Sequence, residues 1–108
     1  MSLKKKSDII KIVENYLEKL SNKIKILEAY LFGSSARGDR FKESDVDLVI
    51  VSNDFNNMQL NERFRIVYSI WPSNIDADLI PLTKNEFNEA LKKSIVFKDA
   101  KKYWKKIR

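Results

Sequence analysis

Acidic side chains in two short segments have the types and spacing that bind a divalent cation. Asp45 and Asp47 open the apolar run DVDLVIV, and Asp76 and Asp78 lie in the later run IDADLIPL. In a β-strand, residues two apart project from the same face, so each segment is expected to present its two carboxylates together. Carboxylates held side by side repel each other, whereas a Mg²⁺ ion between them is bound by both. If the two strands are neighbours, one aspartate of the later segment completes a three-carboxylate cluster that suits one or two ions. Any one of these aspartates alone is better explained as a strand-end or capping residue, and only the repeated D-x-D pattern predicts a site.

The segment LFGSSARG, ahead of the first aspartate pair, has the composition of a turn that binds phosphate. Gly33 allows a sharp turn and close approach of a ligand, and the amides and hydroxyls at Ser34 and Ser35 form an anion-binding concavity. The two glycines of this segment have the spacing of a P-loop, but Asp39 and Arg40 stand where that motif has lysine and a hydroxyl, which excludes a P-loop ATPase. Three basic residues in and after this segment have two explanations: they neutralise phosphate charge, or they are ordinary loop residues. They are Arg37, Arg40 and Lys42. A phosphate turn followed by metal-binding carboxylates predicts nucleotidyl or phosphoryl transfer.

The residue types that are missing narrow the chemistry further. The chain has no histidine and no cysteine, so the commonest general base, the commonest zinc ligand and any disulfide are excluded. A metal must then be bound through oxygen, which favours Mg²⁺, Mn²⁺ or Ca²⁺. The net charge of +6 is compatible with a nucleic-acid partner, but no basic stripe interleaved with aromatic residues is present. A lysine-rich solvated surface is the preferred interpretation, and nucleic acid is the least favoured partner.

These motifs are expected on one small α/β (α+β) domain, residues 1–108, with a mixed β-sheet packed against helices. The hydrophobic spacing and capping residues predict a helix from the N-cap Ser7 to about residue 22, followed by strands at 25–32 and 45–51 and a loop at 52–57. A second helix is predicted at about 59–71, where Pro72 ends it, and a third strand at 75–82. A Thr83–Glu86 capping box opens a helix that runs to about Lys93, and a last helix includes residues 97–107. Pro81 predicts an edge or an end of its strand. No apolar run approaches a membrane span and no secretory signal follows the basic N-terminus, so a cytoplasmic protein with no membrane partner is expected.

The combined pattern G-S-x10-D-x-D resembles the signature of the DNA polymerase β-like nucleotidyltransferases, and the chain is similar to their smallest members, the minimal nucleotidyltransferase domain proteins. The resemblance runs from YLFGSSARGD through SDVDLVIV to DADLIPLTKNEF and covers almost the whole chain. It implies that the glycine–serine turn binds a nucleoside triphosphate and that Asp45 and Asp47 bind Mg²⁺. It also implies a third carboxylate on a later strand, for which Asp78 is preferred and Asp76 is the alternative.

The resemblance further implies a reaction and a partner. Such enzymes usually transfer AMP from ATP to an acceptor and release pyrophosphate, with one or two Mg²⁺ ions, for which Mn²⁺ can substitute. Many small members resemble the antitoxin half of a pair with a HEPN-type helical toxin, to which they add AMP on a tyrosine. The alternative is a non-catalytic antitoxin that neutralises its partner by forming a complex. The acceptor, the preferred base, the activity of the site and the choice between a protein partner and a homo-oligomer stay open.

Several aromatic residues could stack on adenine or face a partner, but helical spacing places most of them in the core. They are Phe55, Tyr68, Trp71, Tyr103 and Trp104. Tyr103 together with Trp104 is the preferred candidate for an interface patch.

Overall fold

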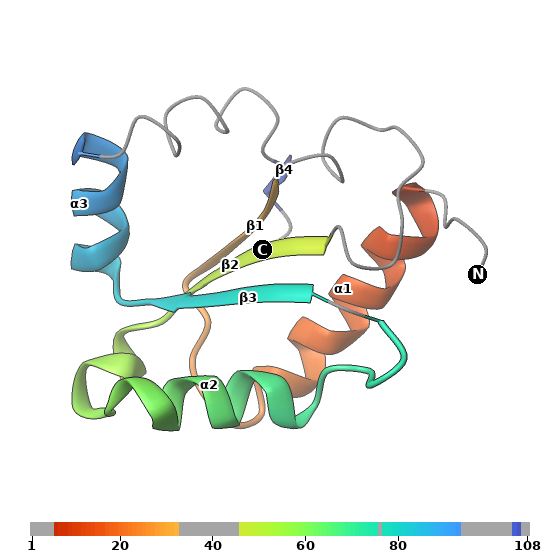
Figure 1. Ribbon diagram of the computed structural model, residues 1–108, viewed down its shortest axis with the longest axis horizontal. Helices are drawn as coiled ribbons and strands as arrows, with labels where there is room; N and C mark the ends of the chain where they lie inside the picture. The colour runs from red at the N-terminus through yellow and green to blue at the C-terminus, as the bar shows by residue number, and fades with distance from the viewer. Residues whose placement is uncertain (1–5, 33–45, 76, 94–104, 107–108) are drawn as a thin grey trace.

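Helices cover both faces of a small mixed β-sheet (Figure 1). The computed structural model describes residues 6–32, 46–75, 77–93 and 105–106. Its elements, in chain order, are α1 Lys6–Leu20, β1 Glu28–Phe32, β2 Val46–Val51, the 3₁₀ helix η3 Asn53–Asn57, α2 Leu60–Ser69, β3 Ala77–Leu82, α3 Lys84–Lys93 and β4 Lys105–Lys106. The predicted fold class, a small mixed sheet packed with helices, is confirmed. Within these ranges no helix combines the length and the apolar character needed to span a membrane.

The strand order of the sheet is β3-β2-β1-β4. β1 pairs antiparallel with β2, whereas β2 pairs parallel with β3 through a crossover that contains α2. β2 therefore lies in the interior of the sheet, as its nearly unbroken apolar run predicts. β3 lies at an edge, which agrees with the presence of Pro81 in that strand.

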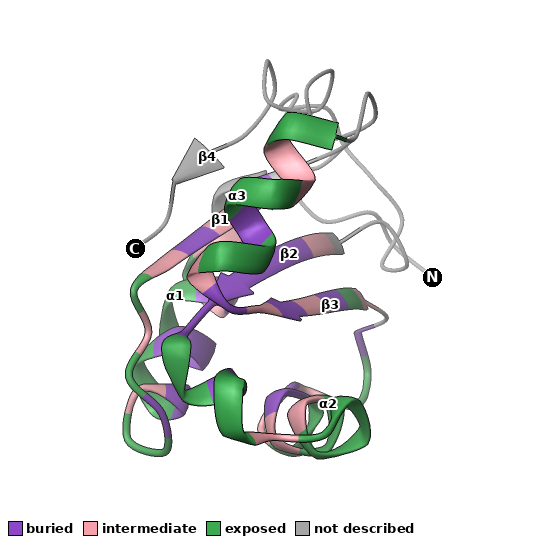
Figure 2. Ribbon diagram, turned by 90° about the vertical axis from the view of Figure 1, so that its left-hand side faces the viewer, coloured by how far each residue is buried: buried purple, intermediate pink, exposed green. Residues whose placement is uncertain are grey.

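The larger core lies between the sheet and the helices α1 and α2. The buried face of α1 packs on the sheet face that carries Leu48 and Ile50 of β2. Tyr16 of α1 joins the two helices, because its hydroxyl donates to the carbonyl of Val67 in α2 (2.6 Å) and its ring meets Trp71 edge-on at 5.0 Å. This packing fixes α1 and α2 on one side of the sheet (Figure 2).

α3 covers the opposite face of the sheet, at the end where β3 finishes (Figure 1). Its buried Phe87 packs against Val49 and Val51 of β2 and stacks on the ring of Tyr30, with ring centroids 5.3 Å apart. Because side chains alternate along a strand, the odd-numbered residues of β2 face α3 and the even-numbered ones face α1 and α2. The direction of the β2 side chains is thus set over the whole strand.

Two of the predicted strands begin later than the spacing indicates. β1 starts three residues after its predicted first residue, because the backbone N–H of Lys25 donates to Asp54 Oδ2 (2.8 Å) and not to a neighbouring strand. At β3 the predicted first residue, Ile75, lies outside the strand, which is described from Ala77, because the carbonyl of Ile75 accepts a hydrogen bond from the indole N–H of Trp71 (2.7 Å). In both places a side chain elsewhere in the sequence takes a backbone group that pairing would have used.

The helix boundaries also differ from the prediction in two places. Ser7 lies inside α1, which begins at Lys6, so its prediction as the N-cap is wrong. The loop predicted at 52–57 forms the 3₁₀ helix η3, for which the Ser52 side chain accepts a hydrogen bond from the N–H of Asp54 (3.2 Å). Residues favoured in turns are equally favoured as caps, which explains why the pattern did not separate the two.

The predicted last helix is wrong where the structure describes it. Lys105 and Lys106 form β4, which pairs antiparallel with Leu31 and Tyr30 of β1. The outer edge of β1 offers unpaired backbone groups, and pairing with them overrides the helical spacing of the sequence. The rest of that predicted helix, including the proposed interface pair Tyr103 and Trp104, lies outside the described residues.

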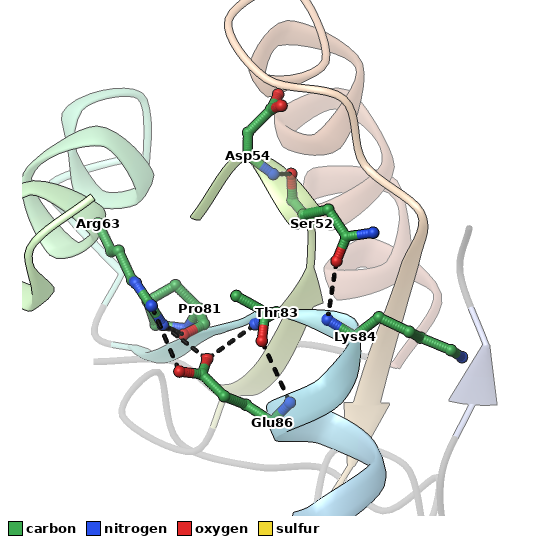
Figure 3. A network of polar contacts seen from close by, with 8 residues as sticks. Ser52, Asp54, Arg63, Pro81, Thr83, Lys84 and Glu86 are labelled. Atoms are coloured by element: carbon green, nitrogen blue, oxygen red, sulfur yellow. Dashed lines mark hydrogen bonds and ion pairs between the residues drawn. The ribbon is translucent and has the colours of Figure 1, made fainter. Parts of the chain in front are cut away.

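The predicted capping box opens α3 and also ties it to α2 (Figure 3). The N–H of Thr83 donates to Glu86 Oε1 (2.8 Å), and the N–H of Glu86 donates to Thr83 Oγ1 (3.1 Å). Arg63 of α2 donates to both carboxylate oxygens of Glu86, at 2.7 and 3.3 Å. Chiefly because of the Arg63 hydrogen bonds, the pKa of Glu86 lies below its ordinary value of 4.5.

Substituting Glu86→Gln is expected to lower the free energy of unfolding at pH 7 by about 1 kcal/mol, because the amide keeps the capping-box contact but loses the charge-assisted hydrogen bonds from Arg63 and the favourable negative charge at the helix N-terminus. A carboxylate with a lowered folded-state pKa stabilises the protein above its unfolded-state pKa, and this contribution is lost as the pH falls through the lowered value. The wild type should therefore lose its advantage over the variant as the pH drops below 4.5. Urea unfolding of both proteins at pH 7 and in acid measures the difference.

Glu89→Gln is the matched control for this test, because Glu89 pairs with Lys93 on the exposed side of the same helix (3.3 Å). An exposed pair of this kind contributes about 0.3 kcal/mol. Equal losses in the two variants, or a difference between wild type and Glu86→Gln that persists in acid, would contradict the assigned role of Glu86.

Candidate active site

Asp47 of β2 and Asp78 of β3 lie directly beside each other in the sheet. The two parallel strands pair in a register that matches Asp47 with Asp78, one step after the pairing of Val46 with Ala77. Each aspartate is the second residue of its strand, so both stand at the same end of the sheet. The condition on which the predicted cluster depends, that the two strands are neighbours, is met for this pair.

Both aspartates occupy positions on the face of the sheet that also carries α3. Val49 and Val51 pack with Ile80 and Leu82 in the cluster around α3, and counting back by two along each strand leads to Asp47 and Asp78. Paired residues of parallel strands project from the same side, so the two carboxylates are neighbours. Like charges in directly adjacent strand positions destabilise a sheet. A cation bound between the two carboxylates offsets this repulsion.

The two carboxylates differ in their exposure to solvent. Asp78 is exposed and Asp47 is partly buried. Among the described residues, no lysine or arginine forms an ion pair with Asp78. The Asp78 carboxylate thus faces solvent at an edge of the sheet, where a cation or a substrate can approach it.

The last residue of β1 lies beside Asp47, at the same end of the sheet as the two aspartates. Phe32, the last residue of β1, is the register partner of Asp47. Gly33 follows Phe32 in the sequence, so the chain enters the predicted phosphate turn from a position beside Asp47. The predicted site residues that lie outside the described part of the chain are Gly33, Ser34, Ser35, Arg37, Arg40, Lys42, Asp45 and the alternative Asp76.

Another part of the α3 face is occupied by contacts among described side chains. Tyr30 stacks on Phe87, its hydroxyl donates to Glu28, and the second oxygen of Glu28 pairs with Lys84. Burial, and next the hydrogen bond with Glu28, raise the pKa of Tyr30 to about 12. The Tyr30 hydroxyl therefore stays protonated at neutral pH.

The donor atoms at this end fit a hard divalent cation. Carboxylate oxygens are the ligands that Mg²⁺ and Mn²⁺ prefer, and Mg²⁺ usually takes only one or two carboxylates from the protein and further oxygens from water and phosphate. Within the described ranges no group of three or more acidic, histidine or cysteine side chains lies together. Two of the three predicted ligands lie in those ranges, and these two are in register.

The described aromatic side chains that were candidates for stacking on adenine differ in their exposure to solvent. Phe55 and Trp71 are buried in the larger core, at 0% and 8% exposure, as their spacing predicts. Tyr68 of α2 is 40% exposed, and its hydroxyl reaches the backbone of β3 on both sides of Asp78, at Ala77 and Leu79. The sequence held no signal for this contact, because helical spacing indicates a buried face but not which backbone groups a hydroxyl will reach.

Sequence comparison identifies the protein family to which the chain is similar. The family model described as the nucleotidyltransferase domain matches residues 10–103. A predicted protein adenylyltransferase of Methanocaldococcus jannaschii is 32% identical over 94 residues, which are 86% of this chain and 93% of that protein. The resemblance drawn from the G-S-x10-D-x-D pattern is thereby confirmed.

Two solved structures have a similar fold. A predicted nucleotidyltransferase from Sulfolobus solfataricus superposes with a TM-score of 0.64 at 28% identity, over 78% of this chain and 75% of that one. A mutant of the toxin–antitoxin complex MntA–HpeT contains a chain that superposes with a TM-score of 0.58 at 21% identity, over 88% of this chain and 72% of that one. The second likeness shows the fold alone. Together with the family model, the M. jannaschii relative shows that this chain belongs to the nucleotidyltransferase family of enzymes.

Proposed function

We propose that this protein is a Mg²⁺-dependent nucleotidyltransferase that transfers AMP from ATP to a hydroxyl group of a partner protein, and that it is the antitoxin of that partner. The observation that carries the metal site is the register of Asp47 beside Asp78 on one face of the sheet. The adenylyl group and the protein acceptor rest on the likeness to the M. jannaschii relative, which is named as a predicted protein adenylyltransferase. The antitoxin role rests on the likeness of fold to the MntA–HpeT complex.

The proposed metal ligands are Asp47 and Asp78, together with Asp45, which precedes Asp47 by two residues in the same run. Mn²⁺ is expected to substitute for Mg²⁺, because both take oxygen ligands. The proposed nucleotide-binding residues are the glycine–serine turn and the cations that follow it, namely Gly33, Ser34, Ser35, Arg37, Arg40 and Lys42. Their backbone amides and positive charges suit a triphosphate.

The proposed reaction is an in-line displacement at the α-phosphorus of ATP. The acceptor oxygen forms a bond to this phosphorus, the bond from it to the bridging oxygen of the β-phosphate breaks, and pyrophosphate leaves. The exposed Asp78 carboxylate orients the acceptor hydroxyl and takes up its proton. When Mg²⁺ is bound, it neutralises charge on the triphosphate and on the leaving pyrophosphate.

The proposed partner is a helical toxin of the HEPN type, with a tyrosine hydroxyl as the acceptor. A single measurement tests the enzyme and the acceptor together: the protein is incubated with candidate partner proteins encoded in the neighbouring reading frame, labelled ATP and Mg²⁺, and mass spectrometry locates any added adenylate. We expect one adenylate on a tyrosine of the toxin, release of pyrophosphate, and no transfer when Mg²⁺ is chelated.

The same mixture separates catalysis from simple binding. Asp47→Asn combined with Asp78→Asn should leave the toxin unmodified and active. If this double variant neutralises the toxin as well as the wild type does, and if no adenylate is found with either protein, the protein acts by forming a complex and the enzymatic proposal is wrong.

A further inference from the structure

Side chains of α2, and not another strand, bind the backbone groups along the outer edge of β3. β3 lies at the end of the sheet order, so its outward-facing backbone groups have no strand partner among the residues that the structure describes. Tyr68 Oη donates to the carbonyl of Ala77 (2.9 Å) and accepts from the N–H of Leu79 (3.0 Å). Arg63 Nη1 reaches the carbonyl of Pro81 at 3.5 Å, and Pro81 has no N–H to satisfy.

The residue between the two groups that Tyr68 binds is Asp78. On its inner side this part of β3 is paired with β2, where Asp78 lies beside Asp47. On its outer side a single hydroxyl, with both its donor and its acceptor capacity in use, holds the backbone before and after Asp78. The strand is therefore held from both sides at the position of the aspartate.

We infer that Tyr68 is a positioning residue for Asp78: its hydroxyl fixes the backbone that sets where the Asp78 carboxylate lies relative to Asp47. This inference rests on the proposed metal site. Mg²⁺ requires ligand oxygens in nearly ideal octahedral geometry, and residues that orient metal ligands commonly change affinity by about 10- to 100-fold when they are removed. A freed strand edge would allow Asp78 to move away from Asp47.

The ring of Tyr68 has a separate role from its hydroxyl, which makes the inference testable by a small change. The ring is 40% exposed and lies against Phe64, with centroids 6.3 Å apart. Tyr68→Phe keeps these ring contacts and removes only the bridge to Ala77 and Leu79. A purely structural hydroxyl would affect the unfolding temperature but not the binding of a metal.

The test measures Mn²⁺ binding by the nucleotide-free protein, from the electron paramagnetic resonance signal of free Mn²⁺. Tyr68→Phe is expected to raise the dissociation constant about tenfold, at the lower end of the range for residues that orient metal ligands. Hydrogen exchange at the Leu79 amide should become faster in the same variant, because its acceptor is gone.

Tyr16→Phe is the matched control, because it removes a buried hydroxyl whose hydrogen bond goes to Val67 of α2 (2.6 Å) and not to the backbone of β3. It is expected to lower the unfolding temperature and to leave Mn²⁺ binding within twofold of the wild type. If Tyr68→Phe binds Mn²⁺ as the wild type does, or if Tyr16→Phe weakens binding equally, the positioning role of Tyr68 is overturned.

Asp78→Asn separates this inference from the proposed function on which it rests. Loss of Mn²⁺ binding in Asp78→Asn, together with weakened binding in Tyr68→Phe, supports both. Wild-type binding in Asp78→Asn would show that the metal site itself is misassigned, whereas loss in Asp78→Asn with unchanged binding in Tyr68→Phe rejects only the role of Tyr68.

Discussion

Replacing Asp47 with asparagine is expected to lower Mg²⁺-dependent nucleotidyl transfer about a thousandfold, because metal catalysis of this type contributes several kcal/mol to transition-state stabilisation. Asp47 is partly buried beside Asp78, and asparagine has nearly the same shape without the charge. The neutral amide is a poor ligand for a hard dication, so the loss should be only partly recovered at high Mg²⁺. Initial rates of pyrophosphate release over a range of Mg²⁺ concentrations measure the effect.

Asp54→Asn is the matched control for this substitution. Asp54 lies in η3, just beyond the opposite end of β2, and its carboxylate accepts a hydrogen bond from the Lys25 N–H (2.8 Å). Asparagine keeps an oxygen acceptor there, so both the rate and the unfolding temperature should stay close to those of the wild type. Wild-type turnover in Asp47→Asn, with Mg²⁺ dependence intact, would remove Asp47 from the metal site.

The largest expected effect on stability is that of Phe55→Ala, with a loss of about 3–5 kcal/mol in the free energy of unfolding. Phe55 is 0% exposed in the larger core, and the Arg63 guanidinium carbon lies 5.7 Å from the centre of its ring. Alanine would leave a cavity beneath η3 and remove the surface on which Arg63 packs. Such a loss is a large part of the ~5–15 kcal/mol that stabilises an ordinary domain.

Urea unfolding provides the measurement, with a lower midpoint and an unchanged slope as the expected result. Phe64→Ala is the comparison, because Phe64 is 39% exposed on α2 and should cost only about 1–2 kcal/mol. Where both variants are folded, their KM for ATP should equal that of the wild type. A raised KM with unchanged stability in Phe55→Ala would mean that Phe55 stacks on the base, contrary to its burial.

The aspartate pattern of the site was accessible from the sequence, but the pairing of its two strands was not. A D-x-D pattern at the start of an apolar run has only one reading in a strand, since a period of two places both aspartates on one face. The similar pattern around Asp78 left open whether the two strands are neighbours, and Pro81 predicted an end of the later strand or an edge position. The register of Asp47 with Asp78 shows that the strands are neighbours.

The sequence by itself therefore determined the fold class, the family and the two strands that carry Asp47 and Asp78, because these depend on local periodicity and on a spaced motif. Only the tertiary structure decided where strands begin and what holds them. Trp71 takes the carbonyl of Ile75, Lys105 and Lys106 pair with β1 in place of a helix, and the Tyr68 hydroxyl closes the edge beside Asp78. Each is a backbone group satisfied by one particular side chain or strand, and residue periodicity contains no information about which partner that will be.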